Sequence, residues 1–136
     1  MAEGTHPTRM AIAQQFLMHV GRSPADRDME LLSPHVTYRV PGTHALAGVF
    51  SGREAIVGHL AALFERTDGS LDTFKWEDWL VGEQHVAALA DVHIHMQGKR
   101  YKSRHLFLVG FDTDDKIVEI VVFFEDEHSA ERFIGR

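Results

Sequence analysis

The amino-acid sequence predicts an α+β fold, in which three helices of the N-terminal half pack on the concave face of a strongly bent, mixed or antiparallel sheet. The 136 residues are 44% hydrophobic, which is enough for one domain with a real core. Apolar side chains recur at helical spacing in the first half of the chain and alternate at strand spacing in the second. Helices followed by a long meander of strands are typical of α+β proteins.

The chain begins with two predicted helices. Residues 7–21 carry apolar side chains at helical spacing, whereas residues 1–6 precede that pattern and are expected to be disordered. Ser23 and Pro24 then provide an N-cap and a first helical residue for a short helix that runs through Leu32. Both helices are therefore expected before the first strand.

A strand, a long bend and a capped helix follow. Residues 35–40 alternate between apolar and polar side chains, which predicts a half-buried strand. Its apolar row is Val36, Tyr38 and Val40. Residues 41–50 then bend before Ser51 and Glu54, which predict a capping box for a helix over residues 52–66. We expect this long bend to form the lip of a pocket.

The second half of the chain reads as an antiparallel meander with turns rich in glycine and aspartate. Four strands and a short closing helix are predicted: 71–81, 84–97, 99–111, 116–125 and 127–134. The last strand is apolar on both faces. The face of the sheet that points away from the helices therefore also needs a cover, and the chain has no helix left to supply it.

Composition excludes several classes of function. A net charge of -6 argues against nucleic acid as a partner, because phosphate binding needs a basic stripe. The absence of cysteine excludes disulfides, thiolate metal sites and a cysteine nucleophile. The N-terminus lacks the apolar core of a signal peptide, and no apolar run approaches the roughly 18 residues of a membrane span. We therefore expect a cytoplasmic protein without a membrane partner.

Three stretches resemble a known family. "VPGTHALAGVFSGREAI" (40–56) resembles the strand, loop and capped helix of SnoaL-like proteins in the nuclear-transport-factor-like superfamily. "DWLVGEQHVAAL" (78–89) and "DDKIVEIVVFFEDEHSAERF" (114–133) resemble a later hairpin and the final strand and helix. The resemblance covers residues 10–134 and implies one SnoaL-like domain over 1–136, a cone-shaped α+β barrel around a pocket. The family includes polyketide cyclases, ketosteroid isomerases, epoxide hydrolases, dehydratases and members without known activity.

The resemblance does not carry over the chemical groups of the family's known enzymes. The tyrosine and the two aspartates of the isomerases fall on Phe16, Val40 and Phe107, so ketosteroid isomerisation by that mechanism is not expected. The acid/base aspartate of the cyclases falls on Val122. The Asp-Arg-Asp set of the epoxide hydrolases cannot be built from Arg104 and its apolar neighbours.

The family's pocket geometry implies a mostly apolar lining. It would consist of Phe16, Tyr38, Val40, Trp76, Ala88, Ala90, Phe107, Val122 and Phe124, with Ser103 and His105 sharing the inward parity of Phe107. His105 is the main catalytic candidate, because a histidine among apolar neighbours can act as acid or base. Alternatively, it is a core histidine bonded to a backbone or hydroxyl group. His44 in the lip could meet a ligand, and His59 lies either at the pocket edge or in solvent.

Asp78 and Tyr38 are the two candidate partners of His105. Asp78 faces the pocket if Trp76 does, and could then orient the imidazole, but a bulge near Trp79 would reverse its direction. Otherwise it is a solvated or turn-bonding carboxylate. Tyr38 would bring a hydroxyl to an apolar wall, where it could hold a carbonyl oxygen. The alternative is a strand aromatic with its tip at the rim.

His93 and His95 share the face opposite the pocket, about 7 Å apart. That spacing suits two metal ligands, but the pattern places no third ligand except Asp91, so we expect neither a metal nor another cofactor. The same face carries an apolar row: Leu89, Leu106, Leu108, Val121 and Phe123. We therefore expect this face, with Arg104 nearby, to be the interface of a homodimer.

Two functions remain open. The first is an enzyme of the cyclase, isomerase, dehydratase or hydrolase type, acting on an apolar cyclic or polyketide-like substrate through acid/base chemistry at His105. The second is a non-catalytic module that binds an apolar small molecule in the same pocket. Proton chemistry requires a dependence on His105 that binding alone does not.

Overall fold

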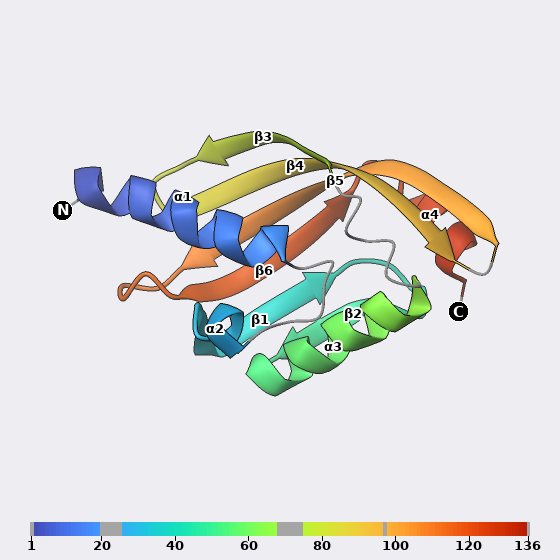
Figure 1. Ribbon diagram of the computed structural model, residues 1–136, viewed down its shortest axis with the longest axis horizontal. Coiled ribbons are helices and arrows are strands. Elements are labelled where there is room, and N and C mark those ends of the chain that lie inside the picture. The colour runs from blue at the N-terminus through green and yellow to red at the C-terminus, as the bar shows by residue number, and fades with distance from the viewer. Residues whose placement is uncertain (1, 20–25, 68–74, 97, 136) are drawn as a thin grey trace.

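A six-stranded mixed sheet forms the frame of the computed structural model, which describes residues 2–19, 26–67, 75–96 and 98–135 (Figure 1). The helices are α1 (Ala2–Met18), α2 (Asp26–Met29), α3 (Arg53–Arg66) and α4 (Glu127–Ile134). The strands are β1 (Leu32–Val40), β2 (Gly48–Ser51), β3 (Lys75–Val81), β4 (His85–Met96), β5 (Lys99–Phe111) and β6 (Ile117–Phe124). The predicted α+β class is confirmed.

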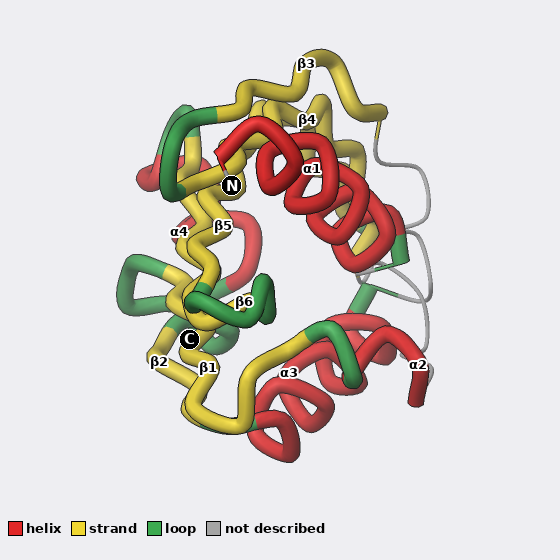
Figure 2. Tube along the Cα trace, turned by 90° about the vertical axis from the view of Figure 1, so that its left-hand side faces the viewer, coloured by secondary structure: helices red, strands yellow, loops and turns green. Residues whose placement is uncertain are grey.

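The strand order in the sheet is β2-β1-β6-β5-β4-β3. β1 and β6 run parallel, and the other neighbours are antiparallel. The sheet bends without closing, so β2 and β3 are its edges (Figure 2). Figure 2 also shows α1 and α3 on the same side of the bent sheet. α1 contacts β3 and β4, α3 contacts β1 and β2, and α4 contacts β5.

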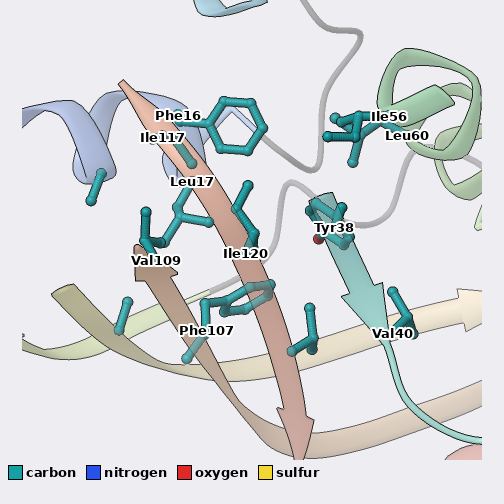
Figure 3. Close-up of a cluster of buried hydrophobic side chains, with 14 of the residues drawn as sticks. Phe16, Leu17, Tyr38, Val40, Ile56, Leu60, Phe107, Val109, Ile117 and Ile120 are labelled. Carbon is teal, nitrogen blue, oxygen red and sulfur yellow. The ribbon is translucent and has the colours of Figure 1, made fainter. Parts of the chain in front are cut away.

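The core lies between these helices and the inner face of the sheet. Phe16 and Leu17 of α1 are almost fully buried, because helical spacing brings both to the side that faces the strands. Ile56 and Leu60 of α3 are buried in the same way and point toward Tyr38 of β1 (Figure 3). Among the described residues, no helix is both long enough and apolar enough to cross a membrane.

The first half of the chain differs from the prediction at several boundaries, among them the end of α1, which is at Met18 and not at residue 21. α1 begins at Ala2, so residues 2–6, expected to be disordered, belong to the helix. α2 ends at Met29, and Leu32, expected to end that helix, is the buried first residue of β1. The start of β1 does not show as regular alternation in the sequence, because the pairing of β1 with β6 shifts register there. Pro34 lies in this stretch and has no backbone N–H to donate to the sheet. The proposed cap, Ser23 and Pro24, lies outside the described residues.

The predicted bend is shorter than expected, because β2 occupies its second half. β2 pairs antiparallel with β1, with Phe50 opposite Tyr38, and leaves residues 41–47 as the bend, here called the lip loop. The predicted capping box is wrong, since Ser51 belongs to β2 and α3 has Gly52 as its N-cap with no side-chain hydrogen bond. Gly52 has a φ of 88°, a conformation that favours glycine, and this allows the sharp turn from strand to helix.

The meander of the second half is confirmed, with strand ends within one residue of the prediction wherever the chain is described. Residues 71–74, predicted to begin β3, lie outside the described part. β4 pairs with β5 over its whole length, with Ala90 opposite His105. This long regular register fixes which side chains of β5 point inward, and it therefore positions the candidate site.

Candidate functional site

A cavity of about 60 Å³ lies between the inner face of the sheet, α3, α4 and the lip loop. Eight of the predicted site residues line it: Tyr38, Val40, His44, His59, His105, Phe107, Val122 and Phe124. Eight further lining residues were not predicted: Leu46, Leu63, Thr67, Ile94, Tyr101, Ala130, Phe133 and Ile134. None of these sixteen residues is a Lys, Arg, Asp or Glu, so the wall is carbon with a few neutral polar groups.

Several residues expected in the pocket lie elsewhere. Phe16 is buried in the core beneath α1, and Trp76 packs on Phe107 with ring centroids 5.4 Å apart, outside the cavity wall. Ala90 is fully buried in β4, and the hydroxyl of Ser103 donates to the carbonyl of Arg104 at 3.4 Å. The predicted lining extended too far toward α1, because the cavity is at the α3 and α4 end of the sheet.

Asp78 does not face the cavity, so the predicted partnership with His105 is wrong. A bulge shifts the register of β3, with Trp76 opposite Ala90 but Asp78 opposite Leu89. The side chain of Asp78 is exposed, and its Oδ1 accepts a hydrogen bond from the backbone N–H of Trp79 at 2.9 Å. The extra residue turns Asp78 to the outer face, as a bulge in a strand does.

His105 instead pairs with a tyrosine on its own strand. The hydroxyl of Tyr101 lies 3.1 Å from Nε2 of His105, and both side chains are buried. Burial is the main cause that lowers the pKa of His105 to about 3, and His44 lowers it further. Burial also raises the pKa of Tyr101. At neutral pH the pair is therefore an uncharged imidazole bonded to an uncharged phenol.

His44 is buried in the lip loop, with 4% of its surface exposed. The backbone N–H of Leu46 donates to Nδ1 of His44 at 3.1 Å. Burial lowers the pKa of His44, although the Glu131 carboxylate and the Pro41 carbonyl oppose this shift, as does Glu127. Of the buried side-chain nitrogen and oxygen atoms in the described part of the chain, Nε2 of His44 is the one without a hydrogen-bond partner.

His59 and Tyr38 also line the cavity. His59 is 6% exposed, so it does not lie in solvent, and its ring stacks on Phe50 at a centroid distance of 4.1 Å. Burial, followed by the influence of His44, lowers the pKa of His59 to about 4. Burial raises the pKa of Tyr38 well above its usual range. Both groups therefore stay uncharged and can act as hydrogen-bond partners for a ligand.

The lip loop and α4 close the cavity together. The Glu131 carboxylate of α4 accepts hydrogen bonds from the backbone N–H and the hydroxyl of Thr43, the latter at 3.0 Å. The backbone N–H of Ala45 donates to the carbonyl of Gly135 at 2.8 Å. α4 places three apolar side chains over the cavity: Ala130, Phe133 and Ile134. Their helical spacing in the sequence was a signal of an inward apolar stripe on this helix.

His93 and His95 are exposed on the outer face of β4. Nε2 of His93 lies 3.1 Å from Oδ2 of Asp91, which makes an exposed ion pair when the imidazole is protonated. Within the described ranges, no group of three or more His, Asp or Glu side chains is placed to hold a metal ion. These residues lie away from the cavity.

The fold has many solved relatives. Bal32a, from a soil-derived mobile gene cassette, superposes with a TM-score of 0.86 at 18% identity, over 96% of this chain and 99% of that chain. A protein with a cystatin-like fold from Xanthomonas campestris gives 0.82 at 22% identity, over 94% and 98%. SalBIII, described as an epoxide hydrolase/cyclase-like enzyme with a role in pyran ring formation in salinomycin, gives 0.66 at 17% identity, over 87% and 91%. The structure therefore has the same fold as these proteins, one of which is described as cystatin-like.

Comparison of the amino-acid sequence with known proteins shows the family to which the chain belongs. Residues 13–120 match the SnoaL-like domain. Two mycobacterial relatives, Rv0034 of Mycobacterium tuberculosis H37Rv and Mb0035 of Mycobacterium bovis, are each 31% identical over 105 residues, which cover 76% of this chain and 79% of the relative. Both are described as uncharacterized. The chain belongs to the SnoaL-like family.

Proposed function

We propose that this SnoaL-like domain binds a small, largely apolar molecule in its cavity and acts on it by acid/base chemistry through His105. The observation that carries the proposal is the Tyr101 and His105 pair, which brings two exchangeable protons into a wall that is otherwise mostly carbon. The reaction would be of the cyclase, isomerase, dehydratase or hydrolase type on a cyclic or polyketide-like substrate. The likeness to SalBIII supports this at the level of fold.

The chemistry depends on how the substrate changes the environment of His105. A pKa of about 3 leaves the imidazole neutral and able to accept a proton, but it makes His105 a weak base at neutral pH. Negative charge that develops on a substrate oxygen next to the ring would stabilise the imidazolium and raise that pKa. The Tyr38 hydroxyl, on the wall formed by β1, can donate a hydrogen bond to such an oxygen.

The size of the cavity limits what it can hold without rearrangement. Its volume of about 60 Å³ is well below the roughly 150 Å³ of an engineered cavity that binds benzene. A ring-sized ligand therefore requires the lip loop and α4 to move away from the sheet. Their mutual bonds involve the exposed Thr43 and Glu131 pair, which can break at modest cost because water competes for the same groups.

The second candidate is a binding module without catalysis, and the electrostatics of the wall favour it. His59 and His105 are both neutral at physiological pH, with pKa values of about 4 and 3. A wall of carbon and neutral hydrogen-bonding groups suits the binding of an apolar molecule as well as its conversion.

Thermal stabilisation by a panel of apolar ketones, lactones and aromatic polyketides tests the shared claim that the cavity binds such molecules. Ala130→Leu should fill the cavity and abolish the stabilisation, because Ala130 lines the wall and is 1% exposed. Ala61→Leu, on the exposed side of α3, is the matched control and should respond as wild type does. A stabilising ligand that Ala130→Leu still binds with unchanged affinity would place the site elsewhere.

A further inference from the structure

The ring of His44 is held in one tautomer by its own loop. The backbone N–H of Leu46 donates to Nδ1 of His44 at 3.1 Å, so Nδ1 must offer a lone pair. In a neutral imidazole the single proton then resides on Nε2. The contact spans two residues of the lip loop, so the loop conformation itself fixes which ring nitrogen is the donor.

This N–H donor is buried and makes no hydrogen bond of good geometry, although the carbonyl of Pro41 lies close enough to the ring to oppose the fall in its pKa. Nε2 of His44 has no hydrogen-bond partner among the described residues, although only 4% of the residue's surface is exposed. A buried donor without an acceptor is rare in folded proteins because it loses its hydrogen bond to water and gains none. His44 also lines the cavity, and the movement of the lip loop that a ring-sized ligand requires would bring the ring within reach of an occupant.

The surroundings of His44 limit the chemistry of that occupant. The cavity wall contains no Lys or Arg to neutralise an anion, and the nearby carboxylates of Glu131 and Glu127 disfavour negative charge. No carboxylate lines the cavity, so a cation is not matched either. An uncharged oxygen acceptor on an apolar body satisfies the donor without burying an unpaired charge.

We propose that Nε2 of His44 binds the acceptor oxygen of a neutral carbonyl, ether or epoxide compound in the cavity. The proposal rests on the proposed function, since it names the ligand class of the same cavity. The ring of Phe124 packs against both His44 and His105, at centroid distances of 5.8 and 4.5 Å. The oxygen-bearing end of the ligand therefore lies at the end of the cavity where His105 can act on it.

A pair of probes with the same shape isolates this hydrogen bond. Cyclopentanone carries a C=O group where methylenecyclopentane carries a C=CH₂ group, so only the ketone can accept a hydrogen bond from His44. The methyl NMR signals of Ile94 and Val122, which line the cavity, report the binding of each probe. Wild type should prefer the ketone by about 3- to 10-fold, the range for one net hydrogen bond. Equal affinity for the two probes would overturn the role of His44 while leaving the cavity as a binding site. If neither probe binds, the proposed function fails as well.

Two variants of His44 test whether the hydrogen-bond donor at the position of Nε2, and not the imidazole ring as a whole, causes the preference for the ketone. His44→Asn keeps an acceptor oxygen for the Leu46 N–H but has no donor at the position of Nε2, so the ketone preference should disappear. His44→Gln can place its amide nitrogen at that position and should retain the preference. A preference that survives in His44→Asn would overturn the proposal.

Nitrogen NMR of wild-type imidazoles gives an answer that does not depend on a variant's folding. The proposal expects the Nε2–H tautomer of His44, with an Nε2 signal that shifts with cyclopentanone and not with methylenecyclopentane. An Nδ1–H tautomer would contradict it.

Discussion

The Tyr101 hydroxyl lies 3.1 Å from Nε2 of His105, and both side chains line the cavity from β5. The two residues are four apart on a strand, so alternation brings them to the same face. Two interpretations of His105 suggested by the sequence are therefore compatible: the ring is bonded to a hydroxyl group, and it also faces the cavity. What the bond does to the protonation of the ring can be measured.

Protonation of the buried histidines should make the protein less stable in mild acid. Burial depresses the pKa of His105 to about 3 and that of His59 to about 4, whereas both return to about 6.5 in the unfolded chain. As the pH falls below about 6.5, these histidines bind protons in the unfolded chain but not in the folded protein, so the free energy of unfolding decreases. Each histidine should contribute a loss of about 2 kcal/mol between pH 7 and 5.

Urea unfolding at the two pH values checks this, with His105→Gln as the variant that removes one of the groups. The variant should lose less stability than wild type between pH 7 and 5, whatever its stability at pH 7. Equal losses in the two proteins would show that His105 titrates normally in the folded state.

Gly42→Ala should destabilise the protein by about 1–3 kcal/mol. Gly42 has a φ of 108°, and a Cβ there would collide with Oε1 of Glu131, which holds Thr43 of the lip loop. Gly58→Ala is the matched control, because Gly58 lies in α3 and no atom is within 4 Å of the added Cβ. This variant should have a free energy of unfolding higher than that of wild type, by at most about 1 kcal/mol. Denaturant titration should show a lower free energy of unfolding for Gly42→Ala and a higher one for Gly58→Ala. An unchanged free energy of unfolding in Gly42→Ala would contradict the described contact between the lip loop and α4.

We propose that a second copy of the chain covers the outer face of the sheet. Phe123 and Leu80 are 46% and 55% exposed there, beside the partly buried Leu89, Leu106 and Leu108. Sedimentation should show twice the 15.4 kDa mass at micromolar concentration, and Phe123→Lys should give monomers. Phe64→Lys replaces a similarly exposed ring on α3 and should remain dimeric. A wild-type monomer would rule out this interface.

The long regular elements could be predicted from the sequence because their patterns repeat many times. β4 and β5 alternate over a dozen residues each, so the inward direction of His105 followed from periodicity. β2 has only four residues, and its identity as a strand depends on pairing with β1, which a local pattern does not encode. The existence of α4 was predicted, but its position over the cavity is set by contacts with the distant lip loop.

The candidate site was predicted only where it lies on regular strands. A bulge near Trp79 that reverses Asp78 was one of two alternatives left open by the sequence, and only the pairing of β3 with β4 shows that the extra residue is present. His44 lies in a loop, where no periodicity indicates burial, and its ring packs against Phe124 of the distant strand β6. Tyr101 shares the strand parity of His105, but its hydrogen bond to His105 requires the three-dimensional geometry.

The central claim is that His105 moves a proton, and His105→Gln tests it most directly. Glutamine stays neutral and can still bond to the Tyr101 hydroxyl, but it cannot take up a proton as imidazole does. With a ligand found by thermal stabilisation, turnover by His105→Gln should fall about 10²–10⁴-fold below wild type, while its affinity changes only a few-fold. Phe107→Leu, which reshapes the wall nearby, should retain most of the turnover. Conversion by His105→Gln at the wild-type rate, or tight binding without any conversion by wild type, would contradict the claim.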